Sequence, residues 1–220
     1  MSELLSDPVS TLLSILGPDP DPVIEEMTAY ADERRFPTVG RDVGQFLTVA
    51  TRMVDARRVF EFGSGFGYSA AWFLRGLPDD GEIVLTDYDG ENLAKADRFL
   101  EQLDFDGTIR YEQGDAIDTF SAIGGTFDIV LIDLEKRQYT NAFSLASERL
   151  EPGGVIVADN MMAGPVTPES VSGALRGKEP VDAATAGIAQ YIDSIRNAPD
   201  FETAFLPLGE GIAVSHRHYE

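Results

Sequence analysis

The sequence predicts an α/β fold: a seven-stranded sheet, mostly parallel, with helices on both faces and an antiparallel hairpin at the C-terminal end. Two observations predict it. Strand-like and helix-like segments alternate through most of the chain, which is typical of a parallel sheet covered by crossover helices. Near the end, two strand-like segments instead flank Leu208-Gly209-Glu210-Gly211, a glycine-containing turn that favours a hairpin.

The elements follow one another in a regular order. Helices are expected first, at 10–16, 23–34 and 43–55, with an extended proline-rich linker at 18–22 between the first two. Strands are then expected at 58–62, 82–86, 108–112, 127–132 and 153–158, alternating with helices at about 67–77, 90–103, 115–122, 138–150 and 184–197. The hairpin strands are expected at 201–207 and 212–216.

The length suits one domain with a sizeable core. The chain has 220 residues, of which 43% are hydrophobic. We expect a single domain over 1–220, made of an N-terminal helical cap at 1–56 and a core at 57–220. The stretch 161–182 is expected to be a long loop beside the site, of the kind that decides substrate choice. Its Met161 and Met162 could form an apolar wall for an aromatic ring or simply pack under the loop.

A glycine-rich turn follows the first strand, with Gly63, Gly65 and Gly67 at alternate positions. Such a turn between strand and helix lets backbone N–H groups approach an anionic ligand closely, although a plain tight turn is the alternative. Tyr68 stands where a dinucleotide-binding GxGxxG motif would carry its last glycine. About 20 residues further on, the next strand ends in Asp87 and Asp89, where nucleoside-binding folds place an acid against the ribose hydroxyls.

Two apolar strands end in acid. The segment 129–132 runs into Asp133, and the segment 155–158 runs into Asp159 and Asn160. Ligands gather at the carboxyl ends of parallel strands, so these side chains are expected to meet. Carboxylate and amide oxygens are hard ligands that suit Mg²⁺ or a similar ion. The alternative is that each aspartate only caps the helix that follows it.

A series of short motifs carries a resemblance to a known family. The motifs are Gly44-Gln45-Phe46-Leu47, Phe60-Glu61-Phe62-Gly63, Gly67-Tyr68-Ser69, Asp133-Leu134-Glu135-Lys136 with Tyr139, Gly153-Gly154-Val155-Ile156, Asp159-Asn160 and Leu206-Pro207-Leu208-Gly209-Glu210-Gly211. In this order and spacing they resemble the cation-dependent catechol and caffeoyl-CoA O-methyltransferases, which are class I S-adenosylmethionine-dependent enzymes. The resemblance extends from about 22 to 217 without large gaps, and it implies a Rossmann-like, doubly wound sheet with a terminal antiparallel hairpin.

The resemblance also implies a role for each matched position. Asp133, Asp159 and Asn160 would hold a divalent cation, with Mg²⁺ favoured and Ca²⁺ or Mn²⁺ as alternatives, and Asp133 and Lys136 would be the catalytic residues. The cofactor would lie against Glu61, Gly63, Ser64, Gly65, Gly67, Tyr68, Ser69, Asp87, Asp115, Ala116 and Asp133. Within that set, Glu61, Gly63 and Ser69 would hold its methionine part, Asp87 its ribose, and Asp115 with Ala116 its adenine.

The chemistry explains these residue types. A catechol hydroxyl is a weak nucleophile near neutral pH, because its reference pKa is about 10. A divalent cation lowers that pKa, and Lys136 can take the proton or stabilise the oxyanion. The sulfonium methyl is already activated, so positioning supplies much of the remaining work. The chain has only three lysines against fourteen arginines, which favours a function for Lys136 over a solvated surface position.

For several other polar and aromatic residues, a structural or surface role is considered beside a functional one. Glu135 either orients Lys136 or the waters on the metal, or it is only a surface acid. His216 and His218 are expected to be surface residues, neither metal ligands nor bases. Trp72 is expected to pack in the core, with substrate stacking as the alternative.

Charge indicates the setting of the protein. The net charge is −21, and an acid-rich, lysine-poor surface repels itself unless salt screens it. This composition favours a halophilic cytoplasm, with an ordinary acidic mesophilic protein as the alternative. Nucleic acid is an unsuitable partner, since phosphate binding relies on Lys and Arg.

The absence of certain sequence features further limits the range of possible functions. The chain has no cysteine, which excludes disulfides, thiolate chemistry and Cys-ligated metals. The N-terminus does not resemble a signal peptide, and no apolar run approaches the roughly 18 residues of a membrane span, so we expect a cytoplasmic protein without a membrane partner.

Three functions compete at this point. The leading one is a metal-assisted O-methyltransferase acting on a small phenolic acceptor, with a homodimer expected from the resemblance. The second is a nucleotide-cofactor oxidoreductase, which Tyr68 and the acidic cluster disfavour. The third is a non-catalytic cofactor-binding protein that keeps the same fold.

Overall fold

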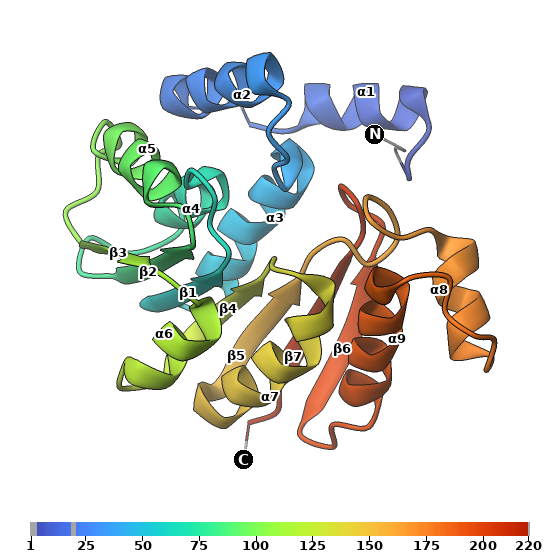
Figure 1. Ribbon diagram of the computed structural model, residues 1–220. Helices are drawn as coiled ribbons and strands as arrows, with labels where there is room; N and C mark the ends of the chain where they lie inside the picture. Colours follow the sequence, from blue (N-terminus) through green and yellow to red (C-terminus); the bar gives the residue numbers. More distant parts are fainter. Residues whose placement is uncertain (1–3, 19–20, 220) are drawn as a thin grey trace.

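A computed structural model describes residues 4–18 and 21–219 (Figure 1). Within these residues the strands form one seven-stranded sheet in the order β3-β2-β1-β4-β5-β7-β6. The strands are β1 (Arg58–Phe62), β2 (Glu82–Asp87), β3 (Thr108–Gln113), β4 (Phe127–Ile132), β5 (Leu150–Ala158), β6 (Phe201–Leu206) and β7 (Ile212–Arg217). The first five run parallel, whereas β7 is antiparallel to both β5 and β6. The predicted fold class is therefore confirmed.

Helices cover both faces of the sheet (Figure 1). They are α1 (Asp7–Leu16), α2 (Pro22–Arg34), α3 (Gly40–Met53), α4 (Tyr68–Leu74), α5 (Gly90–Leu100), α6 (Ala116–Ala122), α7 (Tyr139–Arg149), α8 (Pro168–Leu175) and α9 (Ala183–Arg196), with a short 3₁₀ turn at Lys136–Gln138. Successive residues of a strand point to opposite faces of the sheet, so each strand contributes side chains to two hydrophobic cores. In β1, Val59 belongs to the core under α2–α5, while Phe60 and Phe62 belong to the core under α6, α7 and α9.

The second core is rich in aromatic rings. Phe60 lies with its ring centroid 4.8 Å from that of Phe62 and 4.8 Å from that of Phe120, and Phe127 completes the group. All four rings are fully buried. Edge-to-face packing of this kind adds about 0.5–1.5 kcal/mol per pair beyond area burial. It fixes β1 and β4 side by side, and these strands carry the candidate site at their carboxyl ends.

The boundary between α7 and β5 differs from the predicted one. The expected helix 138–150 ends at Arg149, and β5 begins at Leu150 instead of 153. Leu150 is buried and pairs with Phe127 of β4, and the register then shifts before Ile129 pairs with Val155. Tertiary pairing thus draws Leu150 into the sheet. Most other predicted boundaries differ from the observed ones by one to three residues.

The stretch 161–182 is not the continuous loop that the sequence suggested, because α8 lies within it. Thr167 caps this helix: its side chain accepts from the Ser170 backbone N–H, and the Ser170 hydroxyl accepts from the Thr167 backbone N–H. The helix packs through Val171 against the second core. Met161 is buried there as well, and Met162 is half-buried against the same core, so the two methionines pack under the loop.

The predicted linker at 18–22 is shorter than expected. Asp19 and Pro20 lie outside the described residues, but Pro22 is already the first residue of α2, where its missing N–H costs nothing. Asp21 caps the helix by accepting from the Val23 N–H at 2.8 Å. Proline thus starts α2 here instead of extending the linker.

Candidate active site

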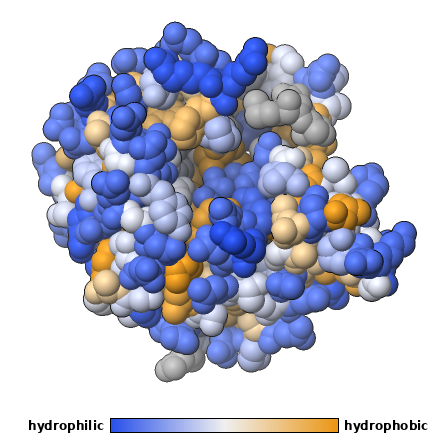
Figure 2. All heavy atoms as spheres, viewed as in Figure 1, coloured by the Kyte–Doolittle hydropathy of each residue, from blue (hydrophilic) through white to orange (hydrophobic). Residues whose placement is uncertain are grey.

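A cavity of about 460 Å³ opens at the carboxyl ends of β1, β4 and β5. It is lined by Gly63, Ser64, Gly65, Tyr68, Ser69, Asp87, Asp133, Lys136, Asp159 and Asn160 from the predicted set, and by Phe36, Pro37, Thr38, Val39, Phe66, Gly164, Pro165 and Glu210. A second cavity of about 210 Å³ shares Gly63, Asp87 and Asp133 with it and reaches Ala116. Among the predicted residues, Glu61, Gly67 and Asp115 line neither cavity. The face of the molecule seen in Figure 2 is hollowed near its centre, with hydrophobic and hydrophilic side chains around the hollow.

The glycine turn brings the backbone of β1 against that of β4. Gly63 has a φ of 83°, and a Cβ at this position would overlap the backbone oxygen of Asp133, so only glycine fits. The Gly65 N–H donates to Asp87 Oδ2 at 3.0 Å. Gly67 instead starts α4, and a Cβ there would meet the side chain of Ala96 at 2.9 Å. Gly67 therefore serves helix packing, whereas Gly63 and Gly65 border the cavity.

Asp87 is held in place from three sides at the end of β2. Besides the contact from Gly65, its Oδ1 accepts from the Asp89 N–H at 2.8 Å and from Asn92 Nδ2 at 3.2 Å. Asp89 itself caps α5 by accepting from the Glu91 N–H at 2.9 Å. Of the two acids at the end of β2, Asp87 therefore faces the cavities. Sequence reasoning missed Asn92, because its contact depends on the first turn of α5.

Asp115 acts mainly on the protein itself. Its Oδ1 caps α6 by accepting from the Ile117 and Asp118 N–H groups, and its Oδ2 accepts from the Tyr88 hydroxyl at 2.6 Å. The bond from Tyr88, with smaller help from the backbone donors, lowers the pKa of Asp115. Ala116 does line the smaller cavity, next to Tyr88. At this position the neighbours Ala116 and Tyr88 border the cavity, and Asp115 orients Tyr88.

Glu61 is the most unusual residue of the region. It is fully buried in β1, and neither carboxylate oxygen has a hydrogen-bond partner among the described residues. Burial raises the pKa of Glu61 to about 8; the nearby Ser69 hydroxyl lowers it in part, although its geometry does not complete a hydrogen bond, and the charge of Asp133 raises it. A buried acid without a partner is costly, so a cationic ligand group placed beside it would recover hydrogen bonds and charge pairing.

The acid cluster lies where β4 and β5 end side by side. The Asp133 N–H donates to the Phe62 carbonyl at 2.9 Å, and the Asp159 N–H donates to the Ile132 carbonyl at 3.1 Å, so both residues continue the sheet. Asp159 is 2% exposed. Burial, followed by the charge of Asp133, raises the pKa of Asp159 well above its ordinary value. Neither aspartate caps a helix, which removes the alternative considered from the sequence.

Lys136 stands in the middle of this cluster. Its Nζ donates to Asp133 Oδ1 at 3.4 Å and also to Asn160 Oδ1 and the Tyr139 hydroxyl. The Tyr139 hydroxyl in turn donates to the Asp159 carbonyl at 3.1 Å. Burial raises the pKa of Tyr139 well above its usual value, as do the charges of Asp133 and Asp159, so this hydroxyl stays protonated. The side chain of Lys136 is only 9% exposed, which excludes a merely solvated lysine.

Glu135 does not orient Lys136. Its carboxylate pairs with the Arg137 Nε at 2.6 Å, and both side chains are largely exposed. Surface pairs of this kind contribute little to stability. Of the two interpretations that the sequence left open, the surface acid is the one that the geometry favours.

The donor set at the strand ends suits a hard divalent cation. Two carboxylates and one amide oxygen line the same cavity, and burial penalises the charged form of Asp159, a penalty that a bound cation would offset. Among the described residues, no group of three His, Cys, Asp or Glu side chains could by itself hold a metal ion. Asn160 is the third donor of the predicted set, so a cation here would depend on an amide oxygen as well as on Asp133 and Asp159.

Sequence reasoning missed several residues that border the cavity. Phe36 and Val39 come from the segment between α2 and α3, and Pro165 comes from the loop after β5. Glu210, from the turn between β6 and β7, accepts from Asn160 Nδ2 at 2.8 Å. Its only signal in the sequence is its place in the C-terminal motif, because contacts from so distant a turn require the fold.

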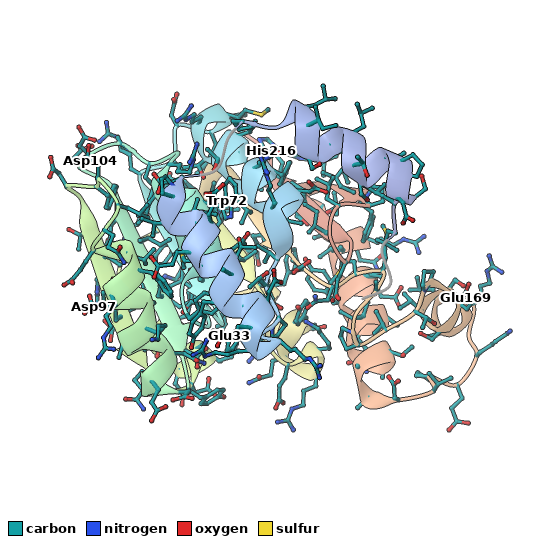
Figure 3. The ribbon with its side chains drawn as sticks, turned by 90° about the horizontal axis from the view of Figure 1, so that it is seen from above. Glu33, Trp72, Asp97, Asp104, Glu169 and His216 are labelled. Atoms are coloured by element: carbon teal, nitrogen blue, oxygen red, sulfur yellow. The ribbon has the colours of Figure 1, made fainter. Side chains whose placement is uncertain are left out.

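Trp72 and the two histidines lie away from this cavity. Trp72 is 1% exposed and lies inside the molecule, whereas acids such as Asp104 and Glu169 lie at the periphery (Figure 3). His218 is exposed as expected, but His216 is half-buried within β7, where it pairs with Val155. The packing interpretation of Trp72 agrees with this placement.

Comparison with known proteins gives a consistent result. A catechol O-methyltransferase from Niastella koreensis is 30% identical over 154 residues, which cover 67% of this chain and 69% of the relative. A catechol O-methyltransferase from Mycobacterium tuberculosis is 31% identical over 147 residues, covering 66% and 67%. An O-methyltransferase from Bacillus cereus, solved in complex with SAH, shares the fold with a TM-score of 0.81 at 22% identity, over 96% of this chain and 97% of that one. The O-methyltransferase family model matches residues 21–218, which confirms the resemblance inferred from the motifs, and the chain belongs to the O-methyltransferase family.

Proposed function

We propose that the protein transfers the methyl group of S-adenosylmethionine to a hydroxyl of a catechol-like phenolic acceptor, with assistance from a divalent cation. The observation that carries the proposal is the placement of Lys136 Nζ among Asp133, Asn160 and Tyr139, in the cavity that the glycine turn also lines. This reaction requires an amine that accepts the proton or stabilises the anion. It also requires hard oxygen donors for the cation and a glycine loop that binds the nucleoside part of the cofactor.

The cofactor would occupy both cavities around Gly63. Its cationic amino group would meet Glu61, whose buried oxygens have no hydrogen-bond partner within 4–18 and 21–219, and its ribose would meet Asp87, which lines both cavities. The adenine would lie in the smaller cavity beside Ala116 and Tyr88. Support also comes from the O-methyltransferase from Bacillus cereus, which was solved in complex with SAH.

Asp133, Asp159 and Asn160 would hold the cation, with Mg²⁺ favoured. When bound, it would supply a Lewis acid that makes a phenolic hydroxyl more acidic and would orient a neighbouring oxygen of the substrate. Lys136 then takes the phenolic proton as a neutral amine, or stabilises the phenolate as an ammonium. The phenolate oxygen forms a bond to the methyl carbon as the carbon–sulfur bond breaks, leaving an aryl methyl ether and S-adenosylhomocysteine.

The apolar part of the cavity lining suits the aromatic ring of the acceptor. Phe36, Pro37, Val39 and Pro165 line the same cavity as the acids. A ring held there would place its hydroxyls toward Lys136 and the oxygen donors. The similarity to two catechol O-methyltransferases supports an acceptor with two adjacent hydroxyls.

Calorimetric titration tests the proposal. S-adenosylhomocysteine is titrated into the protein in molar KCl with Mg²⁺ or with EDTA, and 3,4-dihydroxybenzoate is added last. We expect cofactor binding in both conditions and catechol binding only with Mg²⁺. Asp133→Ala should abolish the Mg²⁺-dependent catechol binding and leave the fold intact, while Asp104→Ala, which removes an exposed acid elsewhere, should change neither. A response to NAD without one to S-adenosylhomocysteine would instead indicate an oxidoreductase.

The acidic surface motivates the choice of molar KCl. We propose that the protein works in a salt-rich cytoplasm, because a net charge of −21 is tolerated best where counterions screen it. Among the described residues, no helix has the length and apolar character that crossing a bilayer requires.

We propose further that the chain pairs with a second copy through α1 and α3. Within α1, Leu12, Ile15 and Leu16 are exposed, and the chain carries no charge from 8 to 18. On so acidic a surface, an uncharged apolar face is where two like-charged copies can approach. An apolar hollow between α1 and α3 would receive the partner's side chains.

Light scattering in molar KCl should give the mass of two chains. Ile15→Asp should reduce it to one, because it places a charge on the exposed face of α1, while Val181→Asp, at an exposed position outside that face, should leave it unchanged. A single-chain mass for the unmodified protein would contradict the dimer.

A further inference from the structure

The side-chain amide of Asn160 has two ends of nearly equal shape and opposite chemistry. Only its oxygen can accept from Lys136 or ligate a cation; its NH₂ group can only donate. Asn160 has a φ of 59°, in the left-handed region, and its N–H donates to Asp159 Oδ1 at 2.7 Å. These backbone features fix where the side chain starts. They do not fix which end of the amide faces the cavity.

Glu210 supplies the missing constraint. Its Oε2 accepts from Asn160 Nδ2 at 2.8 Å, while Asn160 Oδ1 accepts from Lys136 Nζ. A carboxylate can only accept, and an ammonium can only donate. The two partners therefore hold the amide from opposite ends, and a flip would place NH₂ against the ammonium and oxygen against the carboxylate.

The turn that carries Glu210 is built to hold it there. Gly209 and Gly211 flank it with φ values of 54° and 86°. The Glu210 carbonyl accepts from the Met162 and Ala163 N–H groups, both at 2.9 Å, so the backbone of the turn is bonded to the loop after β5. This loop includes Asn160 itself. Backbone and side-chain bonds thus join the same two segments.

The turn and the carboxylate of Glu210 are also closely packed against neighbouring segments. A Cβ on Gly209 would meet Val43 Cγ2 of α3 at 2.8 Å, so the turn lies close against α3. A Cβ on Gly164 would overlap the carboxylate of Glu210. Glycine at 164 therefore makes the space that the carboxylate occupies.

We propose that Glu210 is a positioning residue: through its bond to Nδ2 it keeps Asn160 Oδ1 turned toward Lys136 and the cation. The part that concerns the cation rests on the proposed function. The orientation of the amide does not, because it involves only Glu210, Asn160 and Lys136. Loss of the acceptor at 210 should therefore free the amide whether or not a metal is present.

The first test is made on metal-free protein in EDTA. In a ¹H–¹⁵N correlation spectrum, the side-chain NH₂ of Asn160 is assigned as the pair of signals missing from Asn160→Asp. We expect one of its protons to be shifted downfield and slow to exchange with water, unlike those of the exposed Asn141. In Glu210→Ala both features should disappear, and in Glu210→Gln, which keeps an acceptor oxygen, they should remain. Identical signals in the unmodified protein and Glu210→Ala would overturn the proposal.

The second test measures the affinity for Mg²⁺ by calorimetry in protein saturated with S-adenosylhomocysteine. Glu210→Ala should raise the Kd by about 10- to 100-fold, the usual effect of removing a partner that orients a metal ligand. Glu210→Gln should retain most of the affinity. Glu202→Ala, which removes an exposed acid from the same hairpin, should leave the Kd unchanged.

The outcomes separate the two proposals. If Glu210→Gln loses as much affinity as Glu210→Ala, charge and not orientation is responsible, and the positioning role is wrong. If the unmodified protein binds no Mg²⁺, the metal part of the proposed function fails, while the spectrum of Asn160 still decides the role of Glu210.

Discussion

Replacing Lys136 by alanine is expected to lower kcat for methyl transfer by about 10²- to 10⁴-fold, the usual contribution of a positioned acid–base group. Among the described residues, Lys136 is the only lysine that lines the cavity. Its Nζ donates to Asp133, Asn160 and Tyr139. Without it, the phenolic proton has no amine to receive it and the phenolate has no nearby ammonium. Binding of S-adenosylhomocysteine should change little, because none of the expected cofactor contacts involves Lys136.

Two further variants make this prediction specific. Lys136→Arg keeps a positive charge but cannot act as a base, since arginine is not deprotonated in proteins. Activity near that of the unmodified protein in Lys136→Arg would assign Lys136 a purely electrostatic role. Lys178→Ala removes an exposed lysine and should have no effect. Single-turnover rates are the measurement, and an unchanged rate in Lys136→Ala would contradict the mechanism.

Glu61→Gln is expected to stabilise the ligand-free protein increasingly as the pH rises. The pKa of Glu61 is raised from 4.5 to about 8, so the folded state favours the protonated acid. Its contribution to stability is fully present below about pH 4.5 and is lost as the pH rises toward 8. Glutamine stays neutral and avoids this loss. The gain in free energy of unfolding should approach an upper limit of about 5 kcal/mol above pH 8, at about 1.36 kcal/mol per pKa unit.

Denaturant unfolding at pH 5, 7 and 9 in constant molar KCl measures this effect. The quantity to compare is the difference between Glu61→Gln and the unmodified protein, because other buried acids such as Asp159 affect both proteins alike. Glu101→Gln, at an exposed position, is the matched control. The same substitution should weaken binding of S-adenosylhomocysteine, since a neutral amide pairs less well with its amino group. A difference in stability that does not change with pH would refute the assignment.

The fold was predictable because its signals are local. Apolar runs such as Ile129–Ile132 stay buried on both faces, and a run of this kind bounded by turns indicates a parallel strand. Boundaries were less predictable where packing decides them. The sequence pattern places Leu150 at the end of a helix, but its pairing with Phe127 makes it part of β5. The helix α8 was missed because its capping box ends in Ser170 where glutamate or glutamine is the usual signal.

The site was predictable as far as strand ends determine it. Asp133, Asp159 and Asn160 follow strands that lie side by side, so their meeting follows from the fold class alone. The partners of these residues did not follow. Tyr139 reaches the Asp159 carbonyl from the start of α7, and Glu210 reaches Asn160 across 50 positions of sequence, contacts that no local pattern encodes. The partner of Glu135 could not be predicted either, because both Lys136 and Arg137 follow it directly in the sequence.

The place of β7 between β5 and β6 has a consequence for how the protein is made. The chain emerges from the ribosome from its N-terminal end, and β7, which covers the free edge of β5, follows the other six strands of the sheet in the sequence. Until then β5 exposes an unpaired, wholly apolar edge at 155–158, which is a template for aggregation. Chaperone demand should therefore be greatest between the synthesis of β5 and that of β7, and a chain that stalls before 212 would carry its acid cluster on an unprotected strand.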